Sequence, residues 1–230
     1  MSAVLDRLDA LRSRGVLGDL DAHFAAALVR LSPRPSDALA LAAALASRAA
    51  AEGHACIDLA RLAGSAPLGD EWPAPALAAW CDALHASGAA GAGEPPQPLV
   101  LDGTRLYLQR YWRYEVEIAA DLRARAARVV AVDEAALAAG LARRFPDVAT
   151  GDLQRVAAEQ AVRHGLAVVS GGPGTGKTTT VAKILALLLE QSPHRLPAIA
   201  LAAPTGKAAA RLQAALAAAQ PALGLAAALD

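Results

Sequence analysis

The chain has 230 residues, of which 55% are hydrophobic but only 3% aromatic, and its net charge at pH 7 is zero. This length suits one large or two smaller domains, and proline or charge breaks every apolar stretch well short of a membrane span. Scattered histidines and two distant cysteines exclude a recognisable metal site or redox pair, and the charged N-terminus is no signal peptide, so we expect a cytoplasmic protein.

Helical periodicity and a hairpin signal dominate the first part of the chain. Asp102-Gly103 separates two short apolar runs and predicts a β-hairpin over 99–108, after an exposed loop at 87–98. Spacing and start signals predict helices over 4–14, 19–31, 36–51, 76–86, 109–128 and 133–145. We therefore expect a small, mainly helical domain over residues 1–146, with the boundary at 146–151.

Helices and strands alternate in the remaining residues, 147–230. A helix over 153–164 precedes an apolar strand at 166–170, and a helix from Lys177 closes at Pro193. A second strand at 198–202 leads to a helix over about 208–219. Alternation of this kind predicts a parallel α/β sheet. Residues 151–230 also carry 7 basic and 4 acidic side chains, a mild excess that suits polyphosphate or nucleic acid.

A glycine-rich loop follows the first of these strands and fits the phosphate-loop pattern Gly-x-x-x-x-Gly-Lys-Thr. Glycines let successive N–H groups point at phosphate oxygens, Lys177 would bridge the β- and γ-phosphates, and Thr178 would ligate Mg²⁺. A glycine-rich turn without ligand is the alternative, but the chain has only three lysines against nineteen arginines. The predicted nucleotide site comprises Gly171, Gly172, Pro173, Gly174, Thr175, Gly176, Lys177, Thr178 and Thr179.

A second turn, Thr205-Gly206-Lys207, follows the other predicted strand and opens a helix. On local pattern alone, a solvated turn with an incidental lysine is slightly favoured over a site for a backbone phosphate. Ligands gather at the carboxyl ends of parallel strands, however, and this turn would share an edge with the phosphate loop. Its position therefore favours the phosphate interpretation.

Together these segments resemble superfamily-1 helicases, most closely the RecD family, the alpha subunit of exodeoxyribonuclease V. Residues 171–180 resemble the family's motif I, and 203–212 resemble its motif Ia, which contacts single-stranded DNA. Gln154, seventeen residues before Gly171, is similar to the Q-motif glutamine that reads adenine, whereas Gln160 lies too close to the loop. Residues 106–112 resemble the end of the family's N-terminal domain, although aromatic side chains capping a small core are an ordinary alternative.

The resemblance implies a RecA-like P-loop NTPase domain that uses ATP and Mg²⁺ and moves 5′ to 3′ along DNA. It implies a heterotrimer with the beta and gamma subunits of exodeoxyribonuclease V, acting in double-strand break repair and recombination. The N-terminal domain would dock onto these partners, and Thr205, Gly206 and Lys207 would contact DNA. An AAA-type ATPase, a small-molecule kinase or a non-catalytic assembly module remain as alternatives.

The sequence after the phosphate loop lacks the catalytic carboxylate that the family has at the end of a later strand. After the loop, the only acidic residues in the sequence are Glu190 and Asp230, so we expect the first part of a RecA-like domain, incomplete before its Asp-Glu motif and inactive alone. Residues 129–132 followed by Asp133-Glu134 imitate that motif, but their use would require a circularly permuted NTPase. The simpler interpretation makes Asp133 a helix N-cap.

Overall fold

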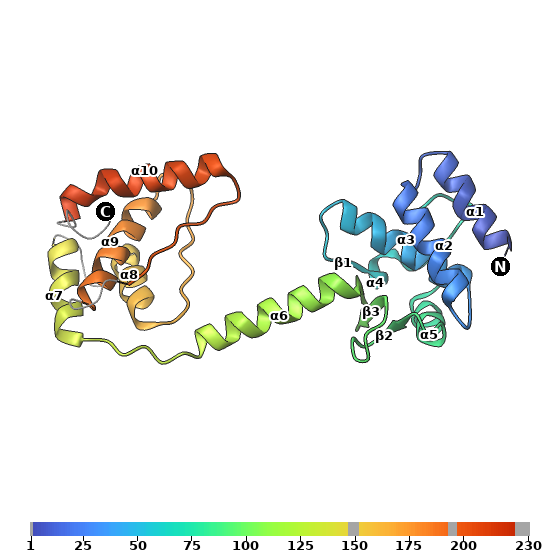
Figure 1. Cartoon of the computed structure of the whole chain (residues 1–230), viewed down its shortest axis with the longest axis horizontal. Coiled ribbons are helices and arrows are strands. Elements are labelled where there is room, and N and C mark those ends of the chain that lie inside the picture. The colour runs from blue at the N-terminus through green and yellow to red at the C-terminus, as the bar shows by residue number, and fades with distance from the viewer. Residues whose placement is uncertain (1, 147–151, 193–196, 224–230) are drawn as a thin grey trace. The chain divides into compact units, whose positions relative to one another are not determined.

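The computed structural model describes residues 2–146, 152–192 and 197–223 (Figure 1). The chain forms two compact units, which divide between Ala119 and Ala120. Each unit has hydrophobic clusters of its own. None of the helices in the described ranges is both long and apolar enough to cross a membrane.

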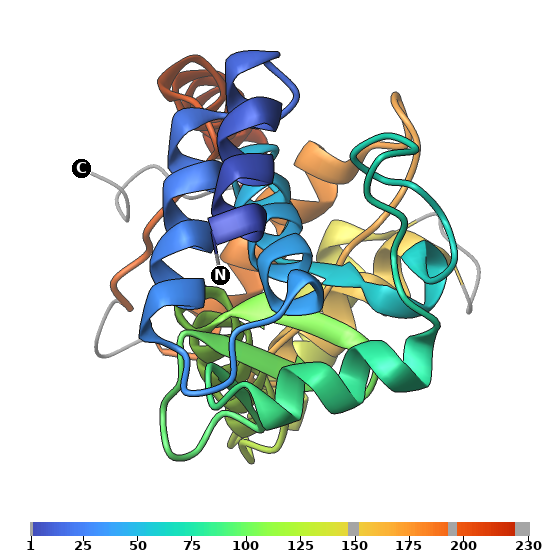
Figure 2. The same cartoon turned by 90° about the vertical axis from the view of Figure 1, so that its right-hand side faces the viewer.

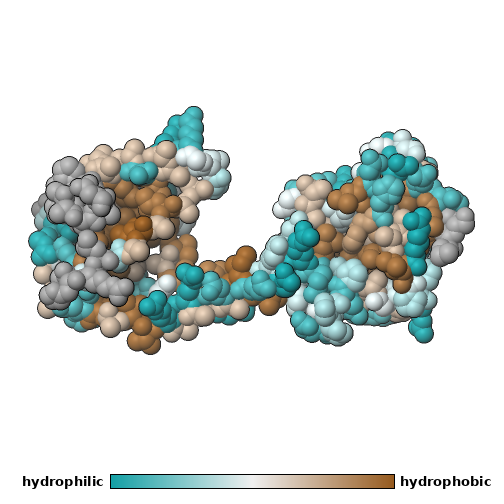
Figure 3. Space-filling model, in the orientation of Figure 1, coloured by the Kyte–Doolittle hydropathy of each residue, from teal (hydrophilic) through white to brown (hydrophobic). Residues whose placement is uncertain are grey.

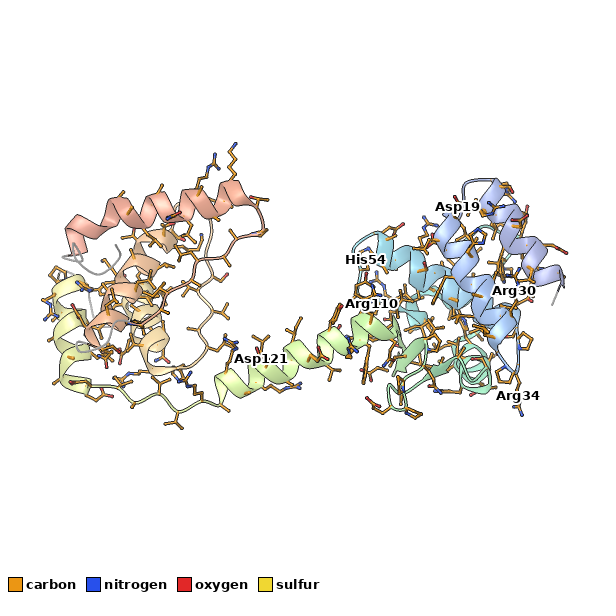
Figure 4. The ribbon with its side chains drawn as sticks, viewed as in Figure 1. Asp19, Arg30, Arg34, His54, Arg110 and Asp121 are labelled. Carbon is orange, nitrogen blue, oxygen red and sulfur yellow. The ribbon has the colours of Figure 1, made fainter. Side chains whose placement is uncertain are left out.

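Five helices lie within the described part of the first unit; the predicted starts of the second and third are confirmed, whereas the first begins at Ser2 and not at residue 4. Ser36 caps α3, because its Oγ accepts the Leu39 N–H at 3.1 Å. Asp19 lies in the first turn of α2 and Arg30 in its last, the signs that the helix dipole favours (Figure 4). The helices are α1 (Ser2–Ser13), α2 (Asp19–Leu31), α3 (Asp37–Ala51), α4 (Leu59–Leu62) and α5 (Leu77–Ala86).

A four-stranded sheet completes this unit, in the order β1-β4-β3-β2. The predicted hairpin is confirmed: β3 (Leu99–Asp102) pairs antiparallel with β4 (Arg105–Leu108), and Gly103 supplies a positive φ of 60° in the two-residue turn. Sequence reasoning missed β1 (Cys56–Asp58), antiparallel to β4, and β2 (Ala90–Gly91), parallel to β3. These strands have three and two residues, too few for an alternating pattern to be recognised.

Helix α3 forms the centre of the first core and packs against α2, α5, β1 and β4, as Figure 2 shows from a second direction. Its alanines 40, 42, 43 and 44 are completely buried, so small side chains let neighbouring elements approach it from several sides. Trp80 of α5 is also completely buried and donates its indole N–H to the Ala38 carbonyl at 3.0 Å. Alanine-rich composition therefore gives a tight core with few aromatic residues.

Helix α6 (Gln109–Ala126) contains the division between the units, and none of its residues is buried. Its surface mixes charged and apolar side chains (Figure 3). Ion pairs at i,i+4 spacing join Arg113 to Glu117 at 3.4 Å and Arg125 to Asp121 at 3.0 Å. Such pairs support an exposed helix by a few tenths of a kcal/mol each, about 0.2–0.5 kcal/mol.

The second unit packs α7 (Glu134–Arg144) and α8 (Leu153–Arg163) against α9 (Lys177–Glu190), and α10 (Gly206–Leu223) also contacts α9. Because α7 belongs to this unit, the unit begins well before the expected boundary at 146–151, of which residues 147–151 lie outside the described residues. Pro193, the expected end of α9, also lies outside them. The shared apolar cluster contains Leu137, Leu141, Phe145, Ala158, Val162, Ile184 and Leu187.

The prediction of strands at 166–170 and 198–202 is wrong for the described structure. Both segments lack regular secondary structure, and the described part of the second unit contains only an isolated antiparallel bridge between Val129 and His164. A strand exists through ladder hydrogen bonds to a neighbour, which an apolar sequence cannot supply by itself. Val168 is accordingly 85% exposed. The predicted parallel sheet is therefore absent from the described residues, whereas the helices around it were predicted correctly.

The buried Tyr107 gives this fold a measurable pH dependence. Its hydroxyl donates to Glu115 Oε1 at 3.3 Å, and burial, followed by the nearby Cys56, raises the Tyr107 pKa from 10.0 to about 12. We expect its contribution to stability to be complete below pH 10 and to be lost as the pH rises through about 12. Spectrophotometric titration should show a tyrosinate transition near pH 12 that Tyr107→Phe removes. Persistence of that transition in the variant would contradict the assignment.

Candidate functional site

The phosphate loop runs directly into α9, and two of its glycines have backbone conformations that side chains disfavour. Gly174 and Gly176 both have φ of +76°. Gly176 is the N-cap of α9 and no side chain caps this helix, unlike α3 and α7, which Ser36 and Asp133 cap. The N–H groups of the first turn have no partners within a helix, so this end of α9 can receive an anion.

The Lys177 ammonium is folded back onto the loop itself. Its Nζ donates to the carbonyls of Gly171, at 2.6 Å, and of Gly172, and lies 3.4 Å from Thr175 Oγ1. Thr175 Oγ1 in turn donates to the Gly172 carbonyl at 2.9 Å. The positive charge is thus held at the mouth of an exposed loop by weak, neutral acceptors, which phosphate oxygens would outcompete because they are charged.

The threonines after Lys177 differ in their surroundings. Thr178 and Thr179 are exposed, so the predicted Mg²⁺ ligand is accessible. Thr180 is buried and its Oγ1 donates to the Gly176 carbonyl at 3.1 Å, which fixes the junction of loop and helix. Sequence reasoning missed this contact. The available signal was a threonine four residues after Gly176, a spacing at which its hydroxyl reaches the backbone carbonyl.

Gln154 lies against the phosphate loop, as its predicted role requires. Its Nε2 donates to the Thr175 carbonyl at 3.1 Å, and a Cβ at Gly176 would lie 2.9 Å from the same nitrogen. Asp152 caps α8 by accepting the Gln154 and Arg155 N–H groups, which places Gln154 in the first turn. Gln154 therefore holds the loop backbone in this structure, and adenine reading stays a prediction.

The second predicted turn also meets the start of α9. Thr205 begins α10, because its Oγ1 accepts the Ala208 N–H at 3.2 Å and its carbonyl accepts the Ala209 N–H at 3.0 Å. An open hollow of about 500 Å³ lies between this turn and Thr178 in the first turn of α9. It is lined by Thr178, Thr205, Lys207, Ala208, Arg211, Leu212 and Ala215.

The carboxylates in the described part of the second unit do not line this hollow, and the one on α9 is engaged elsewhere. Glu190 accepts from Arg144 at 2.6 Å and pairs with Arg143 at 3.1 Å. It lies at the far end of α9, about 20 Å of helix from Lys177. No cluster of three metal-ligating side chains occurs among the described residues. Among the described residues, the candidate site therefore combines groups suited to an anion with no carboxylate that could hold a metal ion.

The Asp133-Glu134 pair has a structural role. Asp133 caps α7 by accepting the Ala136 N–H at 2.9 Å, as the simpler interpretation predicted. Glu134 accepts two hydrogen bonds from Arg163, at 2.6 and 2.9 Å, and this contact lowers the Glu134 pKa. Arg163 also pairs with Glu159 of its own helix at 3.0 Å, so the contact between Glu134 and Arg163 is the one that ties α7 to α8. The geometry gives the circularly permuted alternative no support.

Two family models match the chain. Residues 13–107 match the N-terminal domain of RecBCD enzyme subunit RecD, and residues 154–230 match an AAA domain. Proteins described as "RecBCD enzyme subunit RecD" from Mycobacterium tuberculosis H37Rv and Mycolicibacterium smegmatis are 45% and 46% identical to it, over 88% and 86% of this chain. One from Haemophilus influenzae is 36% identical over 50% of the chain.

The chain resembles the RecD family over most of its length. It spans about a third of the length of the mycobacterial relatives, 34% in each case. The two matched regions fall on the two parts that the motifs distinguished, and the AAA-domain match begins at Gln154 itself. The RecD family resemblance read from the motifs is therefore confirmed by relatives that match across both parts.

The Gln154 contact allows two roles to be separated by experiment. If Gln154 reads adenine, Gln154→Ala should weaken ATP binding and leave GTP binding unchanged. If Gln154 acts by holding the Thr175 carbonyl, the variant should weaken the binding of both nucleotides equally. In that case only the ordering of the phosphate loop is lost, whichever base the nucleotide carries. We expect Gln154→Ala to weaken ATP binding more than GTP binding, as measured by titration calorimetry with both nucleotides. Gln160→Ala, on the exposed side of the same helix, is the matched control; equal losses for ATP and GTP would contradict adenine reading.

Proposed function

We propose that this chain supplies the nucleotide-binding part of a RecD-type subunit, an ATP-dependent DNA helicase within exodeoxyribonuclease V. One observation carries the proposal: an exposed loop with two positive-φ glycines ends on a helix N-terminus that no side chain caps. That geometry suits the phosphates of a nucleoside triphosphate. The resemblance of the motifs adds a 5′ to 3′ direction of movement along DNA and a role in double-strand break repair and recombination.

The residues of the loop fit ATP and Mg²⁺ by their chemistry. Lys177 offers a compact ammonium at the loop mouth, held by carbonyls that a triphosphate replaces. Thr178 offers an exposed hydroxyl for Mg²⁺, which when bound neutralises phosphate charge. Gln154 lies beside the loop, where it would select adenine. Thr205, Gly206 and Lys207 would hold the DNA backbone beside Thr178.

The partners follow from the relatives and from the separate first unit. The relatives are described as subunits of the RecBCD enzyme, so we propose that this chain assembles with the beta and gamma subunits of exodeoxyribonuclease V in a cytoplasmic heterotrimer. The first unit has its own core and carries the match to the RecD N-terminal domain. Docking onto these partners is the function we propose for it.

An AAA-type ATPase is the second candidate, because the family model that matches residues 154–230 is described as an AAA domain. Binding to single-stranded DNA distinguishes the two. A helicase requires it, whereas an AAA-type ATPase without a nucleic-acid substrate does not. The relatives matched over both units favour the helicase subunit.

Lys177→Ala should weaken nucleotide binding by the 230-residue chain. Loss of a charge-assisted hydrogen bond costs about 1.5–3 kcal/mol, so we expect affinity for ATP with Mg²⁺ to fall by about tenfold to a hundredfold. Fluorescent-nucleotide titration measures this. Lys183→Ala removes the same charge from the same helix, where Lys183 lies over the Phe145 ring, and should bind nucleotide like the unmodified chain.

The same proteins test whether these 230 residues hydrolyse ATP. We expect no useful turnover, with or without single-stranded DNA, because Glu190 is paired at the far end of α9 and offers no carboxylate to the loop. Robust DNA-stimulated turnover that Lys177→Ala abolishes would refute this expectation. It would require a catalytic carboxylate elsewhere in the chain.

Docking by the first unit is tested by co-purification. A tagged fragment of residues 1–126 should retain the beta and gamma subunits, whereas residues 127–230 should not. Circular dichroism of each fragment provides the control for folding. If only the second fragment retained the partners, the docking role of the first unit would be wrong.

A further inference from the structure

The first unit has an open apolar groove on its surface. The groove lies among α2, the second half of α3, the end of β4 and the start of α6, and has a volume of about 480 Å³. Leu20 at its rim is 72% exposed, and Phe24, one turn later on the same helix, is half-buried. The large side chains that make the groove apolar are those of Leu20, Phe24, Pro98, Leu108 and Tyr111.

This apolar surface continues along α6. Tyr114 is exposed and contacts Tyr111 edge to face, with 6.4 Å between the ring centroids. Ile118 is 59% exposed and lies seven residues after Tyr111, which places it on the same face of the helix. Residues 111–118 extend this face by about 10 Å at 1.5 Å per residue. Exposed apolar side chains that gather in one place mark a protein contact, whereas single ones need no explanation.

Two polar side chains of the groove are already engaged within the chain. Ser47 donates to Asp21 Oδ1 at 2.6 Å, and Gln109 Nε2 donates to the Gly93 carbonyl at 3.4 Å. A small-molecule site needs several polar groups that converge on its ligand, and these two are not available to one. Recognition in the groove therefore depends mainly on apolar contact, which is the character of a contact between proteins.

Arg110 is the one charged side chain among the described residues that line the groove. It is exposed at the start of α6 (Figure 4) and forms no ion pair in the described part of the chain. By contrast, Arg113 and Arg125 of the same helix pair with Glu117 and Asp121. Complementary charges at the rim of an interface fix its register and disfavour wrong partners. The free charge of Arg110 therefore suits a partner that brings a carboxylate to the rim.

A helix is the form of partner that fits this groove. Strand addition would need an exposed sheet edge, but β4, whose end lines the groove, is already paired with β1 and β3. The remaining walls come mainly from α2, α3 and α6. A groove of side chains between helices receives the apolar face of an amphipathic helix, with anchors at i, i+3 or i+4, and i+7.

We propose that this groove, with the face of α6 that continues it, is the docking surface for an amphipathic helix of a partner subunit, one that carries a carboxylate beside its apolar face. The inference rests on the proposed docking function of the first unit and adds the surface and the chemistry of the partner. The apolar side chains of that helix cover Leu20 and Tyr111, and its carboxylate pairs with Arg110. Apolar burial then supplies the affinity, and the ion pair fixes the orientation.

The apolar part is tested by binding of the 230-residue chain to purified beta and gamma subunits of exodeoxyribonuclease V, measured by biolayer interferometry. Leu20→Ala should weaken binding about tenfold, because it removes most of one leucine side chain from the contact. Leu31→Ala is the matched control, since Leu31 is a leucine of the same helix, 80% exposed and outside the groove. It should bind like the unmodified chain, and circular dichroism should show both variants folded.

A salt titration tests the charged part. Arg110→Gln should weaken binding about fivefold at low salt and make the affinity less dependent on salt, because salt screens an ion pair at the rim. Arg110→Lys keeps the charge and should restore the salt dependence. Arg34→Gln, which removes an exposed charge outside the groove (Figure 4), should leave the affinity and its salt dependence unchanged.

Weaker binding by Leu20→Ala and Arg110→Gln, with both controls unchanged, supports the inference. Unchanged binding by Leu20→Ala would overturn it, as would equal losses in either variant and its control. A dimer of the 230-residue chain in light scattering that Leu20→Ala dissociates would assign the groove to a second copy and also overturn it. If the unmodified chain bound neither subunit, the proposed docking function would fail, and the inference with it.

Discussion

The packing of α7 and α8 against α9 is the constraint on which the candidate site depends, because α9 carries the phosphate loop at its N-terminus. Gly140 makes close packing possible: a Cβ there would lie 2.5 Å from both Leu187 Cδ2 and Glu190 Oε2. At the same end of α9, Gln191 accepts the Asp133 N–H at 2.8 Å and donates to the Asp133 carbonyl at 3.3 Å. The far end of α9 is thereby fixed, while its N-terminus remains open for ligand.

The parts of the fold that local chemistry determines were predictable from sequence. Ser36 and Asp133 cap their helices as expected, Asp102-Gly103 introduces the hairpin, and the helix after the phosphate loop begins at Lys177. Each of these features depends on residues within a few positions of one another. Residue type and spacing are therefore sufficient to predict them.

Features that depend on distant partners were less predictable. The segments at 166–170 and 198–202 have strand-like sequences, but a strand needs neighbours, and the described structure gives them none. The hydrogen bond from Gln154 to the Thr175 carbonyl joins residues 21 positions apart, and no spacing rule gives its geometry. The glycine-rich motif predicted which residues form the loop, whereas the contacts that hold it, including that of Thr180, needed the fold.

The internal hydrogen bonds of Lys177 have a consequence for how tightly this loop can bind its ligand. The ammonium already donates to the Gly171 and Gly172 carbonyls. A phosphate must therefore replace these carbonyls as the acceptor of its hydrogen bonds, because the ammonium is not free to begin with. The affinity then reflects the difference between charged and neutral acceptors, less the cost of leaving two carbonyls to water. An anion with little charge gains almost nothing from such an exchange, so the loop discriminates by charge density before any side chain recognises the base.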